Sequence, residues 1–251
     1  MKRLTTLAYG IISYVVFFAT FLYAIGFIGN LIVPKSIDSV PTVSLGTALF
    51  INTLLLAVFA IQHSVMARPF FKRAWTRIVP EAAERSTYVL FSSLALILLF
   101  ALWQPMGGVI WDLQSSAARN ATHVAYAFGW ALVLYSTFAI DHFDLFGLRQ
   151  VWCYARGVPF VPTTFKQPLL YRIVRHPLYV GWFFVFWATP TMTVAHLFFA
   201  IATTVYTLIA IQLEERDLED MHPEYVEYRK RVPALIPSIG RLFRKPATQA
   251  S

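Results

Sequence analysis

Several histidine and acidic side chains stand at the ends of long apolar segments, where ionisable groups are costly and are therefore functional candidates. His142 lies beside Asp141, and Asp144 follows two residues later. A carboxylate can orient an imidazole ring and raise its basicity, so these residues predict a general base. His63, with Tyr88 as a relay, is the alternative base, and both alternatives stay open. No spacing resembles a closed zinc motif, and we expect no bound metal.

A second group of polar residues lies nearer the C-terminus. Residues 171–182 read YRIVRHPLYVGW, and the pair Glu214–Glu215 ends the last apolar segment. His176 and Tyr179 are three residues apart, so they share a face if this segment is helical. We expect both groups to lie at one membrane depth, at the same ends of the spans as His63 and His142.

The composition indicates which elements position these residues. Hydrophobic residues make up 57% of the 251 residues and charged residues 14%, whereas a soluble domain has about 45–50% and about 25%. Runs long enough to cross a hydrocarbon core of about 30 Å predict an all-α integral membrane protein with five to six transmembrane segments. The lone Cys153 excludes an intramolecular disulfide. The apolar runs cover residues 7–33, 43–66, 88–106, 123–140 and 178–213.

The last run is too long for one helix. Thr189-Pro190-Thr191 interrupts it, because proline ends a helix at the preceding residue. We therefore expect a C-terminal helical hairpin, with a short helix over about 178–189, a tight turn, and a full helix over about 192–213. His196 falls near this turn and is interpreted as an interfacial residue.

The basic residues predict the topology. Of the 21 lysines and arginines, all but Lys35 and Arg119 fall at the N-terminus, in two alternate loops, or in the tail from Arg216 to Lys245. The positive-inside rule therefore predicts that both termini are cytoplasmic. The net charge of +8 is then explained by topology and by anionic lipid headgroups, so membrane lipids are expected partners and nucleic acid is not.

Three segments in order resemble the C-terminal half of the integral membrane methyltransferases, which include isoprenylcysteine carboxyl methyltransferase and the phospholipid methyltransferases. They are residues 171–182, LEERDLED at 213–220 and EYVEYRKRVPALIP at 224–237. The resemblance spans about 163–237 and implies S-adenosylmethionine as the cofactor. It further implies a pocket lined by Tyr171, His176, Tyr179 and a carboxylate of the Glu214–Glu215 pair.

The chemistry of the cofactor is compatible with these residue types. Tyr179 offers an aromatic face to its cationic sulfonium, and a glutamate can pair with its ammonium group. Arg175 or Arg172 can meet its carboxylate. Pro177 is a preferred first-turn residue, and the helix that it begins would expose N–H groups to the same anionic end.

The N-terminal part carries a narrower resemblance, to the bacterial methanethiol S-methyltransferases. It rests on QHSVMARPFFKR at 62–73, ERSTYVLFSSL at 84–94 and FDLFGLRQVW at 143–152. It implies methylation of methanethiol to dimethyl sulfide in a bacterial inner membrane, with the active site facing the cytoplasm. The chain would be one domain, 1–251, with four spans in 1–144 and the cofactor-binding half in 163–237.

Thiol methylation would need a base or a cation near the sulfur, because the thiolate is the nucleophile. His142 or His63 is the expected base, and Arg85 or Arg149 is expected to stabilise the thiolate. Three alternatives remain: a membrane methyltransferase with another small or lipid acceptor, an NADPH-dependent membrane reductase, and a transporter. The chain has no internal repeat of the kind that many transporters carry.

Overall fold

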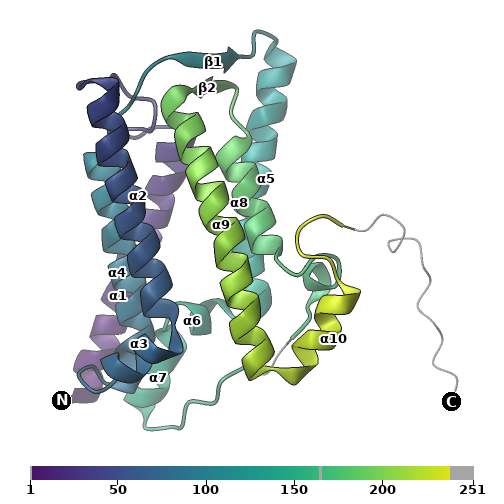
Figure 1. Cartoon of the computed structure of the whole chain (residues 1–251). Helices are drawn as coiled ribbons and strands as arrows, with labels where there is room; N and C mark the ends of the chain where they lie inside the picture. Colours follow the sequence, from purple (N-terminus) through teal and green to yellow (C-terminus); the bar gives the residue numbers. More distant parts are fainter. Residues whose placement is uncertain (1, 164–165, 238–251) are drawn as a thin grey trace, which may run out of the picture.

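Five long apolar helices form a bundle in the computed structural model, which describes residues 2–163 and 166–237 (Figure 1). A sixth helix, α8 (Pro177–Trp187), has 11 residues and is therefore about 16 Å long, too short to cross a core of about 30 Å alone. The expected all-α membrane architecture with a C-terminal hairpin is confirmed. The long helices are α1 (Lys2–Gly29), α2 (Leu45–Ala67), α4 (Glu81–Leu102), α5 (Ser116–Ile140) and α9 (Val194–Met221).

The two ends of the bundle differ in structure (Figure 1). One end, here called the α10 end, carries the start of α1 together with short helices. They are α3 (Pro69–Trp75), α6 (His142–Leu145), α7 (Leu148–Arg156), the 3-10 turn η1 (Leu169–Arg172) and α10 (Pro223–Arg231). The start of α1 and helix α10 therefore lie at the same end of the bundle. Three residues of the predicted basic tail, Arg241, Arg244 and Lys245, lie outside the described residues.

The opposite end, here called the strand end, carries two short strands that the sequence did not predict. β1 (Val109–Asp112) pairs antiparallel with β2 (Thr191–Thr193), so the break at Pro190 is a strand rather than only a tight turn. His196 follows in α9 and is 1% exposed, not interfacial as expected. Its Nδ1 lies 3.5 Å from the carboxylate of Asp38, and its Nε2 is 3.1 Å from the carbonyl oxygen of Phe186.

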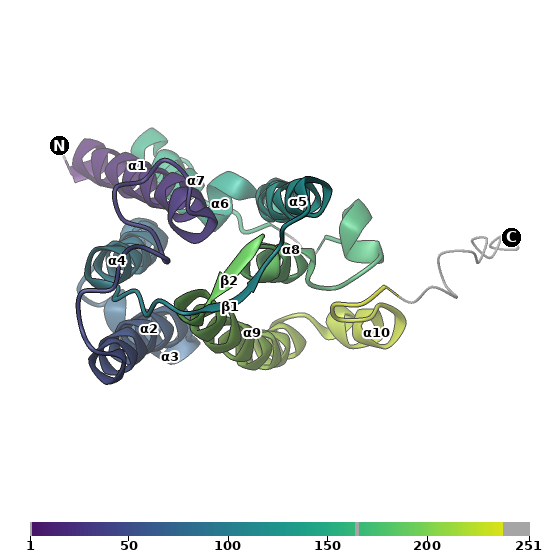
Figure 2. The same cartoon turned by 90° about the horizontal axis from the view of Figure 1, so that it is seen from above.

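The bundle has two halves (Figure 2). In one half, helix α8 lies between α5 and α9, and the other half contains α1, α2 and α4. The contact of α8 with α5 depends on two glycines that face each other. A methyl group on Gly181 would lie 2.8 Å from the carbonyl oxygen of Gly129 and 2.9 Å from the amide nitrogen of Val133. The two backbones therefore approach closely, as small residues allow in membrane bundles.

We expect Gly181→Ala to destabilise the protein by about 1–3 kcal/mol, because the added methyl group must separate two packed backbones. Thermal unfolding in detergent micelles measures the effect. Gly46→Ala is the matched control, since a methyl group there meets nothing within 4 Å. Equal melting temperatures for the two variants would contradict this account of the α5–α8 contact.

Candidate functional site

A buried carboxylate, Glu215 of α9, joins three elements toward the α10 end of the bundle. It is 4% exposed. Its Oε1 lies 2.6 Å from Nη2 of Arg175 and 2.9 Å from Nε2 of His176. The same oxygen accepts from the hydroxyl of Tyr225 at 3.3 Å, and Oε2 lies 3.2 Å from Nε of Arg229. Both oxygens are therefore occupied by the protein itself.

The neighbouring carboxylate, Glu214, has a different environment. The hydroxyl of Tyr179 donates to its Oε2 at 2.7 Å. Among the described residues Oε1 makes no hydrogen bond, and no cationic side chain pairs with Glu214. A carboxylate at the end of a membrane span is costly without a cation. Glu214 is therefore suited to a positively charged ligand.

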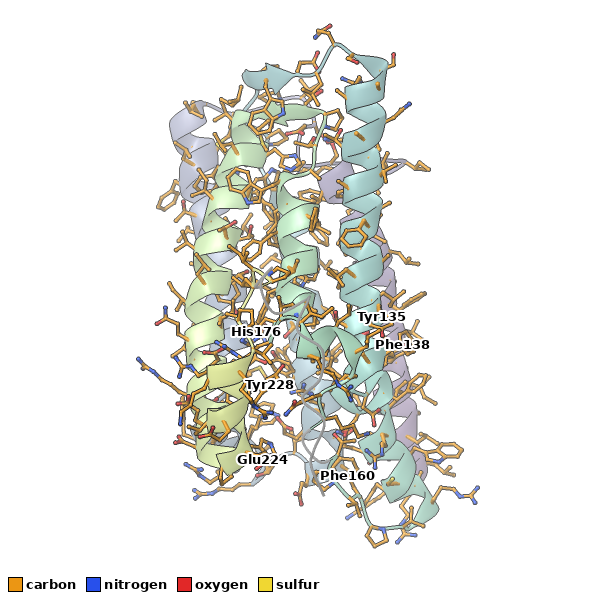
Figure 3. The ribbon with its side chains drawn as sticks, turned by 90° about the vertical axis from the view of Figure 1, so that its right-hand side faces the viewer. Tyr135, Phe138, Phe160, His176, Glu224 and Tyr228 are labelled. Carbon is orange, nitrogen blue, oxygen red and sulfur yellow. The ribbon has the colours of Figure 1, made fainter. Side chains whose placement is uncertain are left out.

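His176 and Tyr179 enter this region from the first turn of α8. His176 is the N-cap residue and Pro177 occupies the first turn, so the chain turns into the helix beside Glu215. Figure 3 shows His176 at this point, with Tyr228 of α10 on the same side of the bundle. The first N–H groups of a helix lack intrahelical partners and carry partial positive charge, which favours an anionic group at this end.

Tyr171 lies in η1, outside the membrane-spanning helices. Its hydroxyl is 3.5 Å from the carbonyl oxygen of Ser136. Burial, together with the Glu214 carboxylate, raises the pKa of Tyr171 above its ordinary range, so the phenol stays protonated. Glu214, which accepts a hydrogen bond from Tyr179, therefore also acts electrostatically on Tyr171, and the backbone of Tyr171 is held by Tyr228.

His63 and Tyr88 form a second polar group between α2 and α4. The hydroxyl of Tyr88 lies 2.9 Å from Nε2 of His63, and Oγ of Ser92 lies 3.1 Å from Nδ1. The ring of Phe59 stacks on the imidazole at 5.2 Å. Tyr88 also interacts electrostatically with Glu214 and with Tyr179.

Arg85 covers Tyr88 from the α10 end. Its guanidinium lies 5.1 Å from the centre of the Tyr88 ring, and its Nε donates to the carbonyl oxygen of Leu145 at 2.7 Å. The same residue borders a cavity of about 670 Å³ that Asp141 and Asp144 also line. Arg85 therefore stands between this cavity and the His63–Tyr88 pair.

The environment of His142 differs from the predicted pair with a carboxylate. His142 is 4% exposed, and its ring nitrogens meet two hydroxyl groups, those of Tyr14 at 2.8 Å and Thr137 at 2.9 Å. The ring of Phe138 stacks on it with centroids 4.1 Å apart. His142 is therefore held by hydroxyl and aromatic groups, and this geometry does not provide the carboxylate that was expected to raise its basicity.

Asp141 and Asp144 bind an arginine instead. Nη1 of Arg149 lies 3.4 Å from Asp141 and 3.2 Å from Asp144. The two carboxylates do not lie on one continuous helix, because α5 ends at Ile140 and Asp141 caps the separate helix α6. The Asp141 side chain accepts from the backbone N–H of Asp144, which explains why a new helix starts here.

The sequence-predicted residues thus fall into two sets. His63 and Arg85 both contact Tyr88, which interacts electrostatically with Glu214, whereas Asp141 and His142 have structural partners of their own. Arg175 and Glu215, both predicted to contact the cofactor, form an ion pair with each other. Within residues 2–163 and 166–237, no group of three or more histidine, cysteine or acidic residues is placed to hold a metal ion.

Sequence reasoning missed the contribution of α10. Tyr225, Tyr228 and Arg229 reach the Glu215 cluster or the backbone of Tyr171. The available indication was the pattern EYVEYRKR, which sets two tyrosines three residues apart on a short basic helix. Their target on α8 and α9 could not be read from that pattern.

The bundle and its polar residues define a multi-pass membrane protein with a histidine, tyrosine and glutamate site toward one end of its helices. Sequence comparisons give its family. The chain is 55% identical over 242 residues to methanethiol S-methyltransferase of Crocosphaera subtropica, covering 96% of this chain and 95% of that protein. It is 52% identical over 238 residues to methanethiol S-methyltransferase of Mycobacterium tuberculosis, covering 94% and 98%.

The chain belongs to the methanethiol S-methyltransferase family, in agreement with the expectation from its motifs. Nurim of Rattus norvegicus is a more distant relative, 32% identical over 173 residues and covering 65% of each chain. Neither a protein-family model nor a solved structure matches the chain.

The burial of His142 has a consequence for stability. Burial lowers the pKa of His142 below its ordinary value of 6.5, so the folded protein holds the neutral ring while the unfolded chain takes up a proton more readily. The stability contributed by the neutral ring is therefore present above pH 6.5 and is lost as the pH falls below it.

We expect His142→Asn to reduce the fall in melting temperature between about pH 7 and about pH 5. Thermal unfolding in detergent at several pH values measures this slope. His123→Asn, an exposed change at the strand end, should keep the wild-type slope. Identical profiles for wild type and His142→Asn would contradict the assignment.

Proposed function

We propose that this protein transfers a methyl group from S-adenosylmethionine to methanethiol, with dimethyl sulfide as the product. The observation that carries the proposal is the Glu214 carboxylate, which accepts a hydrogen bond from Tyr179, interacts electrostatically with Tyr88, and has no cationic partner among the described residues. The relatives named methanethiol S-methyltransferase support the acceptor and the reaction.

The residues of the site fit the cofactor by charge and shape. Glu214 would pair with the cationic ammonium group or sulfonium, and Tyr179 would offer an aromatic face. The first turn of α8 favours the carboxylate of the cofactor. Arg172 is the better arginine for that group, because it is exposed and Arg175 is held by Glu215.

The acceptor half of the reaction is assigned to His63 and Tyr88. S-adenosylmethionine supplies a methyl group already activated on its sulfonium. His63 takes the thiol proton, directly or through the Tyr88 hydroxyl that contacts its ring. Arg85, over the Tyr88 ring, stabilises the thiolate. The thiolate sulfur would bond to the methyl carbon as the carbon–sulfonium bond breaks, and S-adenosylhomocysteine would leave. Because opposite charges would cancel in this step, exclusion of water would favour it.

His63 is preferred to His142 as the base because of its neighbours. It contacts Tyr88, which interacts electrostatically with Glu214. The ring nitrogens of His142 contact Tyr14 and Thr137 instead. We therefore expect His63→Ala to lower kcat by about 10²–10⁴-fold, the usual contribution of a general base. His142→Ala should lower it less, through stability alone.

The assay follows dimethyl sulfide formed from methanethiol and labelled S-adenosylmethionine by the purified protein, with NADPH binding titrated in parallel. Cofactor binding without turnover of any small thiol would refute the acceptor. Binding of NADPH and not S-adenosylmethionine would refute the reaction class. A His63→Ala variant with a wild-type rate would refute the base.

Glu214→Gln should raise the KM for S-adenosylmethionine at least about tenfold, a loss of about 1.4 kcal/mol, because the amide keeps the shape and removes the charge. The matched control is Glu227→Gln on the exposed face of α10, where the carboxylate pairs with Lys230. A wild-type KM in Glu214→Gln would remove the main support for the cofactor pocket.

We further propose that the α10 end faces the cytoplasm of a bacterial inner membrane. The support is the basic residues of the loops at that end and the positive-inside rule. Cys153, the only cysteine of the chain, lies in α7 at this end and is partly exposed.

A membrane-impermeant maleimide should therefore label Cys153 in inverted vesicles and not in intact cells from which the outer membrane has been removed. In a Cys153→Ser background, Ser115→Cys near the strand end should show the reverse pattern. Labelling of Cys153 from outside the intact cells would invert the proposed topology.

A further inference from the structure

We propose that α10 and the segment after it form a clasp, through Tyr225, Tyr228, Pro233 and Ala234, that holds the Arg175-His176 backbone at the start of α8. We further propose that Glu215 is a positioning residue of this clasp rather than a cofactor ligand. This proposal rests on the proposed function in one respect: the role of the clasp is to present His176 and Tyr179 to S-adenosylmethionine. The clasp itself is a property of the protein without ligand.

The first component of the clasp is a pair of backbone hydrogen bonds. The N–H of Arg175 donates to the carbonyl oxygen of Pro233 at 2.8 Å, and the N–H of His176 donates to that of Ala234 at 3.1 Å. These residues come immediately before the first turn of α8. Because the two bonds fix the direction of the chain there, they also fix the direction in which α8 begins.

The side chain of Arg175 provides the second component. Its Nη1 donates to the carbonyl oxygens of Arg229, at 3.0 Å, and Val232, while its Nε and Nη2 contact Glu215. The last carbonyl groups of α10 lack intrahelical partners, so this arginine satisfies the end of one helix while it is anchored to another. With its donors used in this way, Arg175 is not available to a ligand.

Two tyrosines of α10 complete the clasp, and each is 2% exposed. The Tyr225 hydroxyl donates to Glu215, and the Tyr228 hydroxyl donates to the carbonyl oxygen of Tyr171. Burial raises the pKa of Tyr228 to about 12, so the hydroxyl remains a donor at neutral pH. One face of α10 is thereby attached both to η1 and to α9.

The adjacent glutamates therefore have different roles. Consecutive helical residues point about 100° apart, so Glu215 faces the arginines and α10 while Glu214 faces Tyr179. The charge of Glu215 is balanced by Arg175 and Arg229, and that of Glu214 is left for the ligand. Removing either charge should weaken cofactor binding, but only the loss of Glu215 should also loosen the start of α8.

Amide hydrogen exchange separates these two effects. The full-length protein in detergent micelles, without cofactor, is followed by mass spectrometry over peptides that contain Arg175 and His176. Tyr228→Phe and Glu215→Gln should increase exchange at these two amides at least about tenfold, which corresponds to about 1.4 kcal/mol of lost protection. Glu214→Gln and the exposed control Glu227→Gln should exchange as the wild type does.

Steady-state kinetics with S-adenosylmethionine provide the second readout. Tyr228→Phe, which removes only one hydroxyl and remains informative where Glu215→Gln fails to fold, should raise the KM for the cofactor by about tenfold with a smaller change in kcat. Glu227→Gln should keep wild-type constants. Wild-type exchange in both Tyr228→Phe and Glu215→Gln would overturn the clasp.

The failure of this proposal is distinguishable from failure of the proposed function. A wild-type protein that binds no S-adenosylmethionine would refute the function, while the exchange experiment would still decide whether the clasp exists. Unchanged exchange in Glu215→Gln together with lost cofactor binding would make Glu215 a direct ligand and refute its positioning role.

Discussion

A carboxylate buried beside a membrane span must be compensated, and the compensation of Glu215 organises the C-terminal half of this protein. An uncompensated charge in a low-dielectric region is strongly destabilising. Glu215 therefore requires Arg175 and Arg229 close to it, and these belong to the start of α8 and to α10. One electrostatic requirement thus brings three separate elements of the chain together and leaves the neighbouring Glu214 at a fixed position relative to Tyr179.

The short length of α8 follows from the same arrangement. A helix of 11 residues cannot cross the bilayer, so its N-terminus lies within the depth spanned by the long helices. The backbone before it is not helical, and its polar groups need partners inside the protein. Pro233 and Ala234 supply the carbonyl oxygens that Arg175 and His176 require. The close contact between Gly129 and Gly181 then fixes α8 against α5.

The limits of the sequence analysis follow from the range of the interactions. Spans, the helical hairpin and the grouping of basic residues depend on local composition, and the sequence predicts them well. The partners of His142 include Tyr14, 128 residues away in sequence, and no local pattern indicates that contact. The neighbouring carboxylates suggested a pair with His142, but Arg149 is a stronger partner for two aspartates than a neutral imidazole is. The α10 contacts to Tyr171 and Glu215 were missed for the same reason, since they depend on tertiary packing.

Carboxylates differ in whether the protein itself pairs both of their oxygens. We use this difference to distinguish structural carboxylates from a candidate ligand-binding one. At the strand end, Asp38 is surrounded by Asn30, Thr193 and His196, and its two oxygens are used within the protein. Glu215 is saturated in the same way by the arginines and Tyr225. Glu214 is the exception among these carboxylates, with one hydrogen bond, from Tyr179, and no cation among the described residues. Glu214 therefore differs from Asp38 and Glu215 in carrying a charge that the described protein groups do not balance, and this is the charge that a cationic ligand complements.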